Sequence, residues 1–175
     1  MDMIPSFSVD HTKIVPGIFE SRVDVVGNDE LITTFDIRMK TPNAEPAVAP
    51  AAMHTIEHVV ATYLRNNDEW KDKLIYWGPM GCLTGFYIIV KGRPAASEMY
   101  PIILESFKYM SEYEGEVPGA TPENCGNYLM HDLPMAKWEA KKYVDYLEKA
   151  DKSLIFTYPQ TERLKLDDGQ NFFDS

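Results

Sequence analysis

Residues 54–58 read HTIEH, and two histidines four positions apart with a glutamate between them can bind a metal ion. Each residue of an α-helix turns by about 100°, so His54 and His58 would share one face of a helix. Glu57 would then stand beside a cation held by the two imidazoles without having to ligate it. This H-x-x-E-H order occurs in metal sites whose glutamate transfers protons. The pattern also fits ordinary polar residues on an amphipathic helix, so a third ligand is needed.

The two cysteines of the chain are the soft candidates for that third ligand. Cys125 lies in PENCGN, a loop-like setting from which a thiolate can reach a helix face. A His2Cys set with an open fourth position suits a borderline cation such as Zn(II) or Fe(II). Cys82 lies between glycines in GPMGCLTG, where it is either a reactive thiol or a small buried apolar residue. His11, His131 and the carboxylates remain alternatives, and residue chemistry alone leaves the choice open.

Two pairs of β-rich segments predict an antiparallel sheet. Residues 18–26 and 31–39 are separated by the turn sequence GNDE, which predicts a hairpin. Residues 73–92 read as a strand, a Gly/Pro turn and a second strand.

Three further segments predict helices. Residues 51–65, which contain HTIEH, and residues 95–114 carry apolar side chains at helical spacing. Residues 131–150 form the third predicted helix, with Asp132 as N-cap and Pro134 in the first turn, where proline is tolerated. The connection between the second and third helices, about residues 115–126, is predicted to be a loop.

Size and composition predict one α+β domain over residues 1–175, an antiparallel sheet with helices packed on one face and the HxxEH pattern on a helix. Hydrophobic residues make up 45% of the chain and charged residues 25%, which is typical of globular domains. No internal repeat or low-complexity linker divides the chain. Residues from about 151 to 175 are read as an irregular C-terminal extension to which we assign no role.

The net charge of −10, with scattered basic residues, argues against nucleic acid and anionic membranes as partners. The N-terminal sequence MDMIPSFSVDH has neither the basic start nor the apolar core of a signal peptide. No apolar run is long enough to cross a bilayer. We therefore expect a cytoplasmic protein, in which both cysteines stay reduced.

Five segments together resemble the S-ribosylhomocysteine lyases, the autoinducer-2 synthases of the LuxS family. The resemblance runs from about residue 4 to residue 150, and the combination of HTxEH, PMGCxTG(Y/F)Y and CG…HDL is specific. The matching segments, in the order and approximate spacing of the family, are SFSVDH (6–11), FDIR (35–38), HTIEH (54–58), GPMGCLTGFY (78–87) and CGNYLMHDL (125–133).

The resemblance implies a homodimeric α+β enzyme with its active sites at the dimer interface. Such an enzyme cleaves S-ribosylhomocysteine to homocysteine and 4,5-dihydroxy-2,3-pentanedione, the precursor of autoinducer-2. Its cofactor would be Fe(II), one per chain, for which Zn(II) or Co(II) can substitute.

Matched by motif, the resemblance implies that His54, His58 and Cys125 ligate the metal. Glu57 and Cys82 would be the acid/base pair. The residues that would contact the ribosyl part of the substrate are Ser6, His11 and Arg38.

Two departures, at Tyr76 and Leu83, qualify the resemblance. Many family members read D-I-S-P-M-G-C where this chain reads Y-W-G-P-M-G-C, so Tyr76 replaces an acidic substrate contact, and that contact is not carried over. Leu83 stands where Arg or Gln is expected. His131 and Asp132 also match a family motif, and we interpret them as a structural histidine beside a helix N-cap.

Two other functions fit parts of the pattern. H-x-x-E-H also marks inverzincin-type metallopeptidases, whose third ligand is a downstream glutamate, but those enzymes are much longer chains built from repeated domains. The second alternative is a metal-storing or redox-sensing protein in which Cys82 is merely oxidisable.

Overall fold

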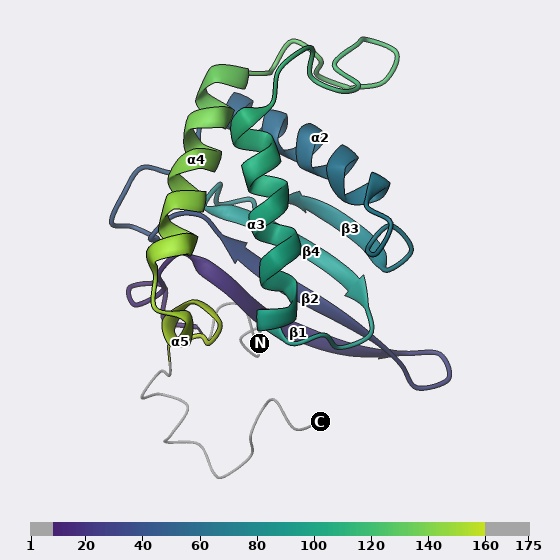
Figure 1. Cartoon of the computed structure of the whole chain (residues 1–175), viewed down its shortest axis with the longest axis vertical. Coiled ribbons are helices and arrows are strands. Elements are labelled where there is room, and N and C mark those ends of the chain that lie inside the picture. The colour runs from purple at the N-terminus through teal and green to yellow at the C-terminus, as the bar shows by residue number, and fades with distance from the viewer. Residues whose placement is uncertain (1–8, 160–175) are drawn as a thin grey trace, which may run out of the picture.

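The computed structural model describes residues 9–159, which form a four-stranded sheet in the order β1-β2-β4-β3 (Figure 1). All neighbouring strands are antiparallel, as predicted. Gly27 and Asp29 adopt left-handed backbone conformations in the turn between the first two strands, which closes the hairpin. The strands are β1 (Gly17–Val26), β2 (Glu30–Arg38), β3 (Leu74–Pro79) and β4 (Gly85–Lys91).

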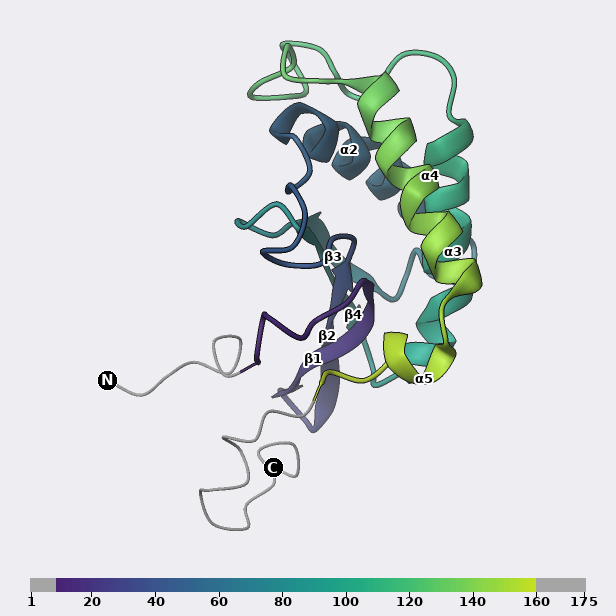
Figure 2. The same ribbon diagram turned by 90° about the vertical axis from the view of Figure 1, so that its left-hand side faces the viewer.

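Three long helices cover one face of this sheet, which confirms the predicted α+β architecture (Figure 2). They are α2 (Pro50–Asn66), α3 (Ala96–Glu112) and α4 (Leu133–Lys149). The side chain of Asp132 accepts a hydrogen bond from the Met135 N–H at 3.0 Å, so the predicted N-cap of α4 is confirmed. Across residues 9–159, no helix combines the length and apolar character needed to cross a membrane.

The alternation of side chains along β2 separates an apolar face from a polar one. Phe35 and Ile37 are fully buried in the core beneath the helices. Burial of each such side chain contributes about 1.5–3 kcal/mol to folding. Asp36 lies between these two residues in the sequence, and Arg38 follows them. Both point to the opposite face of the sheet, because the side chains of successive strand residues point to alternate faces. The strand β2 therefore contributes to the apolar core on one face of the sheet and to a polar group on the other face.

The segment after α4 is more ordered than its composition predicts. A short helix, α5 (Lys152–Ile155), follows α4 directly, where we expected irregular structure. Ile155 is fully buried and belongs to the main core. Beyond it, the ring of Tyr158 stacks on Phe19 of β1, with ring centroids 4.6 Å apart. Tertiary packing, rather than local periodicity, orders this part of the predicted extension; its remaining residues lie outside the described range.

The close approach of β2 and β4 at Gly85 gives a test of the fold. A Cβ atom at this position would lie 2.2 Å from the carbonyl oxygen of Ile37, a backbone atom that cannot move aside. We expect Gly85→Ala to lower the free energy of unfolding by about 2 kcal/mol, as overpacking does. Urea denaturation followed by circular dichroism measures this loss.

Gly81→Ala is the matched control, because a Cβ atom there meets nothing within 4 Å. Its free energy of unfolding should stay within about 0.5 kcal/mol of the parent value. Equal stability of the two variants would contradict the strand contact described at Gly85.

Candidate metal centre

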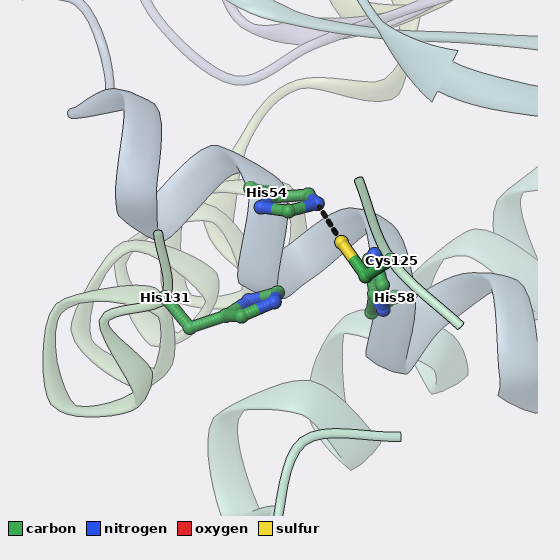
Figure 3. Close-up of side chains that lie close together, drawn as sticks. All are labelled: His54, His58, Cys125 and His131. Atoms are coloured by element: carbon green, nitrogen blue, oxygen red, sulfur yellow. Dashed lines mark hydrogen bonds between the residues drawn. The ribbon is translucent and has the colours of Figure 1, made fainter. Parts of the chain in front are cut away.

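Four side chains that can ligate a metal lie together between α2 and the long connection from α3 to α4 (Figure 3). The ligand atoms of His54, His58, Cys125 and His131 all lie within 4.8 Å of one another. The two histidines of α2 share one helix face, as their spacing predicts, and their ring centroids are 4.6 Å apart. The connection, residues 113–132, lies beyond α2 from the sheet and brings the other two side chains to that face (Figures 1 and 2).

Backbone carbonyls set the tautomer of both α2 histidines. Nδ1 of His54 donates a hydrogen bond to the carbonyl oxygen of Met130 at 2.9 Å, and Nδ1 of His58 donates to that of Pro118 at 2.7 Å. A carbonyl oxygen can only accept, so each Nδ1 carries the proton and each Nε2 keeps a free lone pair. Ligating histidines in metalloproteins are held in the same way.

Cys125 is the cysteine that lies beside these histidines. Its sulfur is 3.4 Å from Nε2 of His54, and the backbone N–H of Asn127 donates to the same sulfur at 3.4 Å. Thr121 holds the local turn, because its carbonyl oxygen accepts from the Cys125 N–H at 3.0 Å. Cys82 is not in the cluster. The geometry therefore favours Cys125 as the third ligand.

His131 lies in the cluster as well, although we had interpreted it as a purely structural residue. The Thr55 hydroxyl donates to the carbonyl oxygen of Ala51 at 2.9 Å, so at 3.2 Å it must accept from Nδ1 of His131. Nε2 of His131 therefore keeps its lone pair, and this buried atom has no hydrogen-bond partner among residues 9–159. Burial, assisted by the neighbouring His54 and His58, lowers the pKa of His131 and keeps the ring neutral.

Ring orientation argues against His54 and His131 both ligating one ion. Its ring stacks on His54, with centroids 4.2 Å apart and planes at 18°. Lone pairs lie in the ring plane, so those of two stacked rings run side by side instead of converging on one ion. His58 lies at 87° to His54 and at 76° to His131, so its lone pair can converge with that of either ring. The Cys125 sulfur lies 3.4 Å from Nε2 of His54, which favours His54 as the second imidazole. The donor set that fits one cation is thus two imidazoles and the Cys125 thiolate, which matches a site with an open position.

Glu57 stands next to this donor set on α2. It is half-buried, and it makes no hydrogen bond or ion pair with any residue that the structure describes. Its carboxylate is therefore available to exchange protons with a bound molecule.

Cys82 and Arg38 form a second group, on different elements from the cluster. Cys82 is exposed in the connection between β3 and β4, and its sulfur lies 3.0 Å from the Thr84 hydroxyl. Nη1 of Arg38, at the end of β2, lies 3.9 Å from that sulfur. Within residues 9–159, Cys82 makes no hydrogen bond to a member of the metal cluster.

The two remaining expected substrate contacts lie near the N-terminus. His11 is half-buried, and its Nδ1 lies 2.8 Å from the carbonyl oxygen of Val9. Ser6 lies outside the described residues.

The departures from the family pattern at positions 76 and 78 are linked in space. Tyr76 is 45% exposed on β3, and its side chain lies over Gly78. A Cβ atom at position 78 would be 2.0 Å from the Tyr76 hydroxyl oxygen. A side chain at position 78 would therefore require the exposed Tyr76 ring to turn away from its present position.

The donor set predicts different metal binding by the two cysteine variants. Cys125→Ala should lose the thiolate-to-metal absorption of the Co(II)-loaded protein. Its Co(II) affinity should fall by more than about 100-fold, since even changes outside the ligand set cost about 10–100-fold. Equilibrium dialysis and absorption spectroscopy measure both quantities. Cys82→Ala is the control and should retain both, and unchanged binding by Cys125→Ala would exclude this cysteine as a ligand.

Comparison with known proteins agrees with this geometry. Residues 4–153 match the family model described as S-Ribosylhomocysteinase (LuxS). A relative named S-ribosylhomocysteine lyase from Phocaeicola vulgatus is 54% identical over 163 residues, which cover 93% of this chain and 100% of the relative. Proteins of the same name from Porphyromonas gingivalis and Clostridium beijerinckii are 51% and 46% identical, covering 82% and 89% of this chain and 90% and 99% of the relatives.

These similarities extend over nearly the whole chain and include every segment of the candidate site. None of them supports the metallopeptidase alternative. The chain belongs to the S-ribosylhomocysteinase (LuxS) family.

Proposed function

We propose that this protein cleaves S-ribosylhomocysteine to homocysteine and 4,5-dihydroxy-2,3-pentanedione. Membership of the family and the names of its relatives support this reaction. The observation that carries it is the cluster of His54, His58 and Cys125, with their lone pairs free and Glu57 alongside.

The substrate determines what such a site must do. The carbon–sulfur bond at carbon 5 of the ribosyl part is unactivated, and it breaks readily only when a carbonyl at carbon 3 makes the carbon 4 proton acidic. The carbonyl must therefore move from carbon 1 to carbon 2 and then to carbon 3 before homocysteine is expelled. Each shift passes through an enediolate with negative charge on oxygen. A divalent metal, when bound, supplies Lewis-acid stabilisation of that charge, worth several kcal/mol.

The proton transfers fall to Glu57 and Cys82 in this proposal. The helix holds the Glu57 carboxylate beside the metal ligands, where it can remove a proton from a sugar carbon and return it to the neighbouring one. Cys82 acts as a thiolate, which the positive charge of Arg38 at 3.9 Å favours. Ser6, His11 and Arg38 are proposed to contact the hydroxyl groups of the ribosyl part.

The proposed cofactor is one Fe(II) per chain, with Zn(II) or Co(II) as substitutes. Two neutral imidazoles and one thiolate leave a divalent ion with a net positive charge, and all three ions accept this donor set. We place the reaction in the cytoplasm, because both Cys82 and Cys125 must remain reduced.

We further propose that the enzyme is a homodimer whose sites combine two chains. The metal cluster lies between α2 and residues 113–132, whereas Cys82 and Arg38 meet at the end of β2, and no hydrogen bond or ion pair joins the two groups within residues 9–159. Both must act on the same sugar. A second copy can supply the missing half, with the cluster of one chain facing the Cys82 group of the other.

Turnover of the substrate tests the proposed reaction. Anaerobically purified protein is incubated with S-ribosylhomocysteine, and homocysteine is determined with a thiol reagent after the protein is removed. Glu57→Gln and Cys82→Ala should keep their metal and lose about 10²–10⁴-fold in kcat, since each removes one acid/base group. His58→Ala should lose both metal and activity. A metal-loaded parent protein that releases no homocysteine would refute the lyase function.

Mixing two inactive variants tests the shared sites. Differently tagged His58→Ala and Cys82→Ala chains are co-expressed, and the mixed dimer is isolated through both tags. One of its two sites combines an intact cluster with an intact Cys82, so activity should return to about half of the parent value. A mixed dimer as inactive as either variant would place both groups in sites made by a single chain.

A further inference from the structure

A series of connected polar side chains on the helix-free face of the sheet ends at the Cys82 sulfur. It begins at Tyr158, passes through Asp36 and Arg38, and reaches Cys82 at the exposed end. Asp36 is 1% exposed and Arg38 3% exposed. Two charges buried this deeply are expensive to desolvate, so their geometry must be well satisfied.

The carboxylate of Asp36 holds the guanidinium of Arg38 along one edge. Nε donates to one carboxylate oxygen at 3.1 Å, and Nη2 donates to the other, which makes a bidentate pair. The remaining nitrogen, Nη1, donates to the Thr84 hydroxyl at 2.6 Å and lies 3.9 Å from the Cys82 sulfur. Because of the bidentate contact, the Nη1 edge of the Arg38 guanidinium faces the Cys82 thiol.

Tyr158 supports this pair from behind. Its hydroxyl donates to Oδ2 of Asp36 at 2.7 Å, the same oxygen that accepts from Arg38. Its ring stacks on Phe19, which lies directly opposite Asp36 in the register of β1 and β2. Burial and the neighbouring carboxylate raise the pKa of Tyr158 well above its ordinary value, so the hydroxyl stays protonated and remains a donor.

We propose that Tyr158 and Asp36 are positioning residues that hold Arg38 against the Cys82 sulfur, which makes the segment after α4 part of the support of the catalytic thiol. The proposal rests on the assignment of Cys82 as an acid/base group. The hydroxyl of Tyr158 partly compensates the charge of Asp36, which leaves more of the positive charge of Arg38 to stabilise a thiolate. It also keeps the carboxylate in the orientation that the bidentate contact requires.

Besides the uncharged Thr84 hydroxyl, 3.0 Å from the sulfur, the titratable groups that act on Cys82 among residues 9–159 come from three elements. β2 contributes Arg38 and, behind it, Asp36. β4 contributes Tyr87, whose pKa is raised by burial and by Asp36, so the phenol stays neutral. The segment after α5 contributes Tyr158. The charged neighbours are therefore one cation and the carboxylate that orients it.

Replacing Tyr158 by phenylalanine removes the hydroxyl and keeps the stacked ring. The negative charge of Asp36 is then less compensated, and Arg38 is drawn towards it. Both effects leave less positive charge beside the Cys82 sulfur. In the metal-loaded protein, alkylation of Cys82 by iodoacetamide at pH 6.5 should slow by about fivefold, the size expected for one hydrogen bond. The limiting rate at high pH should not change. Mass spectrometry of the Cys82 peptide follows the reaction, independently of lyase activity.

Tyr100→Phe is the matched control. The Tyr100 hydroxyl donates to the carbonyl oxygen of Leu147 at 3.1 Å and accepts from Lys152 at 2.8 Å, and its ring packs on Phe156. This variant loosens the same segment without touching Asp36, so its alkylation profile should match that of the parent. An unchanged profile in Tyr158→Phe, or an equal shift in both variants, would overturn the proposal.

Arg38→Lys keeps the result interpretable if Tyr158→Phe fails to fold. A lysine retains the charge but loses the bidentate contact that holds it beside the sulfur, so alkylation of Cys82 at pH 6.5 should again slow. If this variant has the alkylation profile of the parent, Arg38 does not act on the Cys82 thiol, and the proposal is overturned. If the parent protein lacks lyase activity, the alkylation profiles still report whether the positioning exists, so the two failures can be told apart.

Discussion

The hydrogen bonds from His54 and His58 to the carbonyl oxygens of Met130 and Pro118 are the interactions on which the metal centre depends. They set the tautomer of each ring, so both Nε2 lone pairs face the same space. They also tie residues 113–132 to α2, and this connection brings Cys125 to the helix. Loss of either bond would leave a partly buried donor unpaired and release a ligand at the same time.

A second constraint is the alternation of side chains along β2, which places successive residues on opposite faces of the sheet. Phe35 and Ile37 fill the core beneath the helices, while Asp36 and Arg38 bury an ion pair on the other face. An apolar pair of similar volume would stabilise the fold as well or better, because burying charge is costly. Stability alone therefore does not account for this ion pair, whose guanidinium Nη1 lies 3.9 Å from the Cys82 sulfur.

The parts of the site that were predicted from sequence are those encoded by local spacing. HTIEH places two histidines on one helix face because the helical period alone decides it. Cys125 and His54 are 71 residues apart in the sequence, so their contact depends on the tertiary fold and not on a local pattern. The contact of His131 with Thr55 depends on the tertiary fold in the same way. Tyr158 lies in a segment without periodicity, so no local pattern predicts its stacking on Phe19 or its hydrogen bond to Asp36. Residue chemistry leaves the third ligand open, and only the family resemblance indicates Cys125 from sequence.

The position of His131 bears on how a site with four potential ligands can remain catalytic. A cation held by four protein side chains is closed, as in structural zinc sites, whereas a catalytic ion needs one position for the substrate. Stacking on His54 directs the His131 lone pair alongside that of its neighbour instead of towards the shared centre. Thr55 holds the ring in this orientation through Nδ1. The same contacts that bring His131 into the cluster therefore argue against its ligating the same cation as His54, which agrees with a three-residue donor set and an open fourth position.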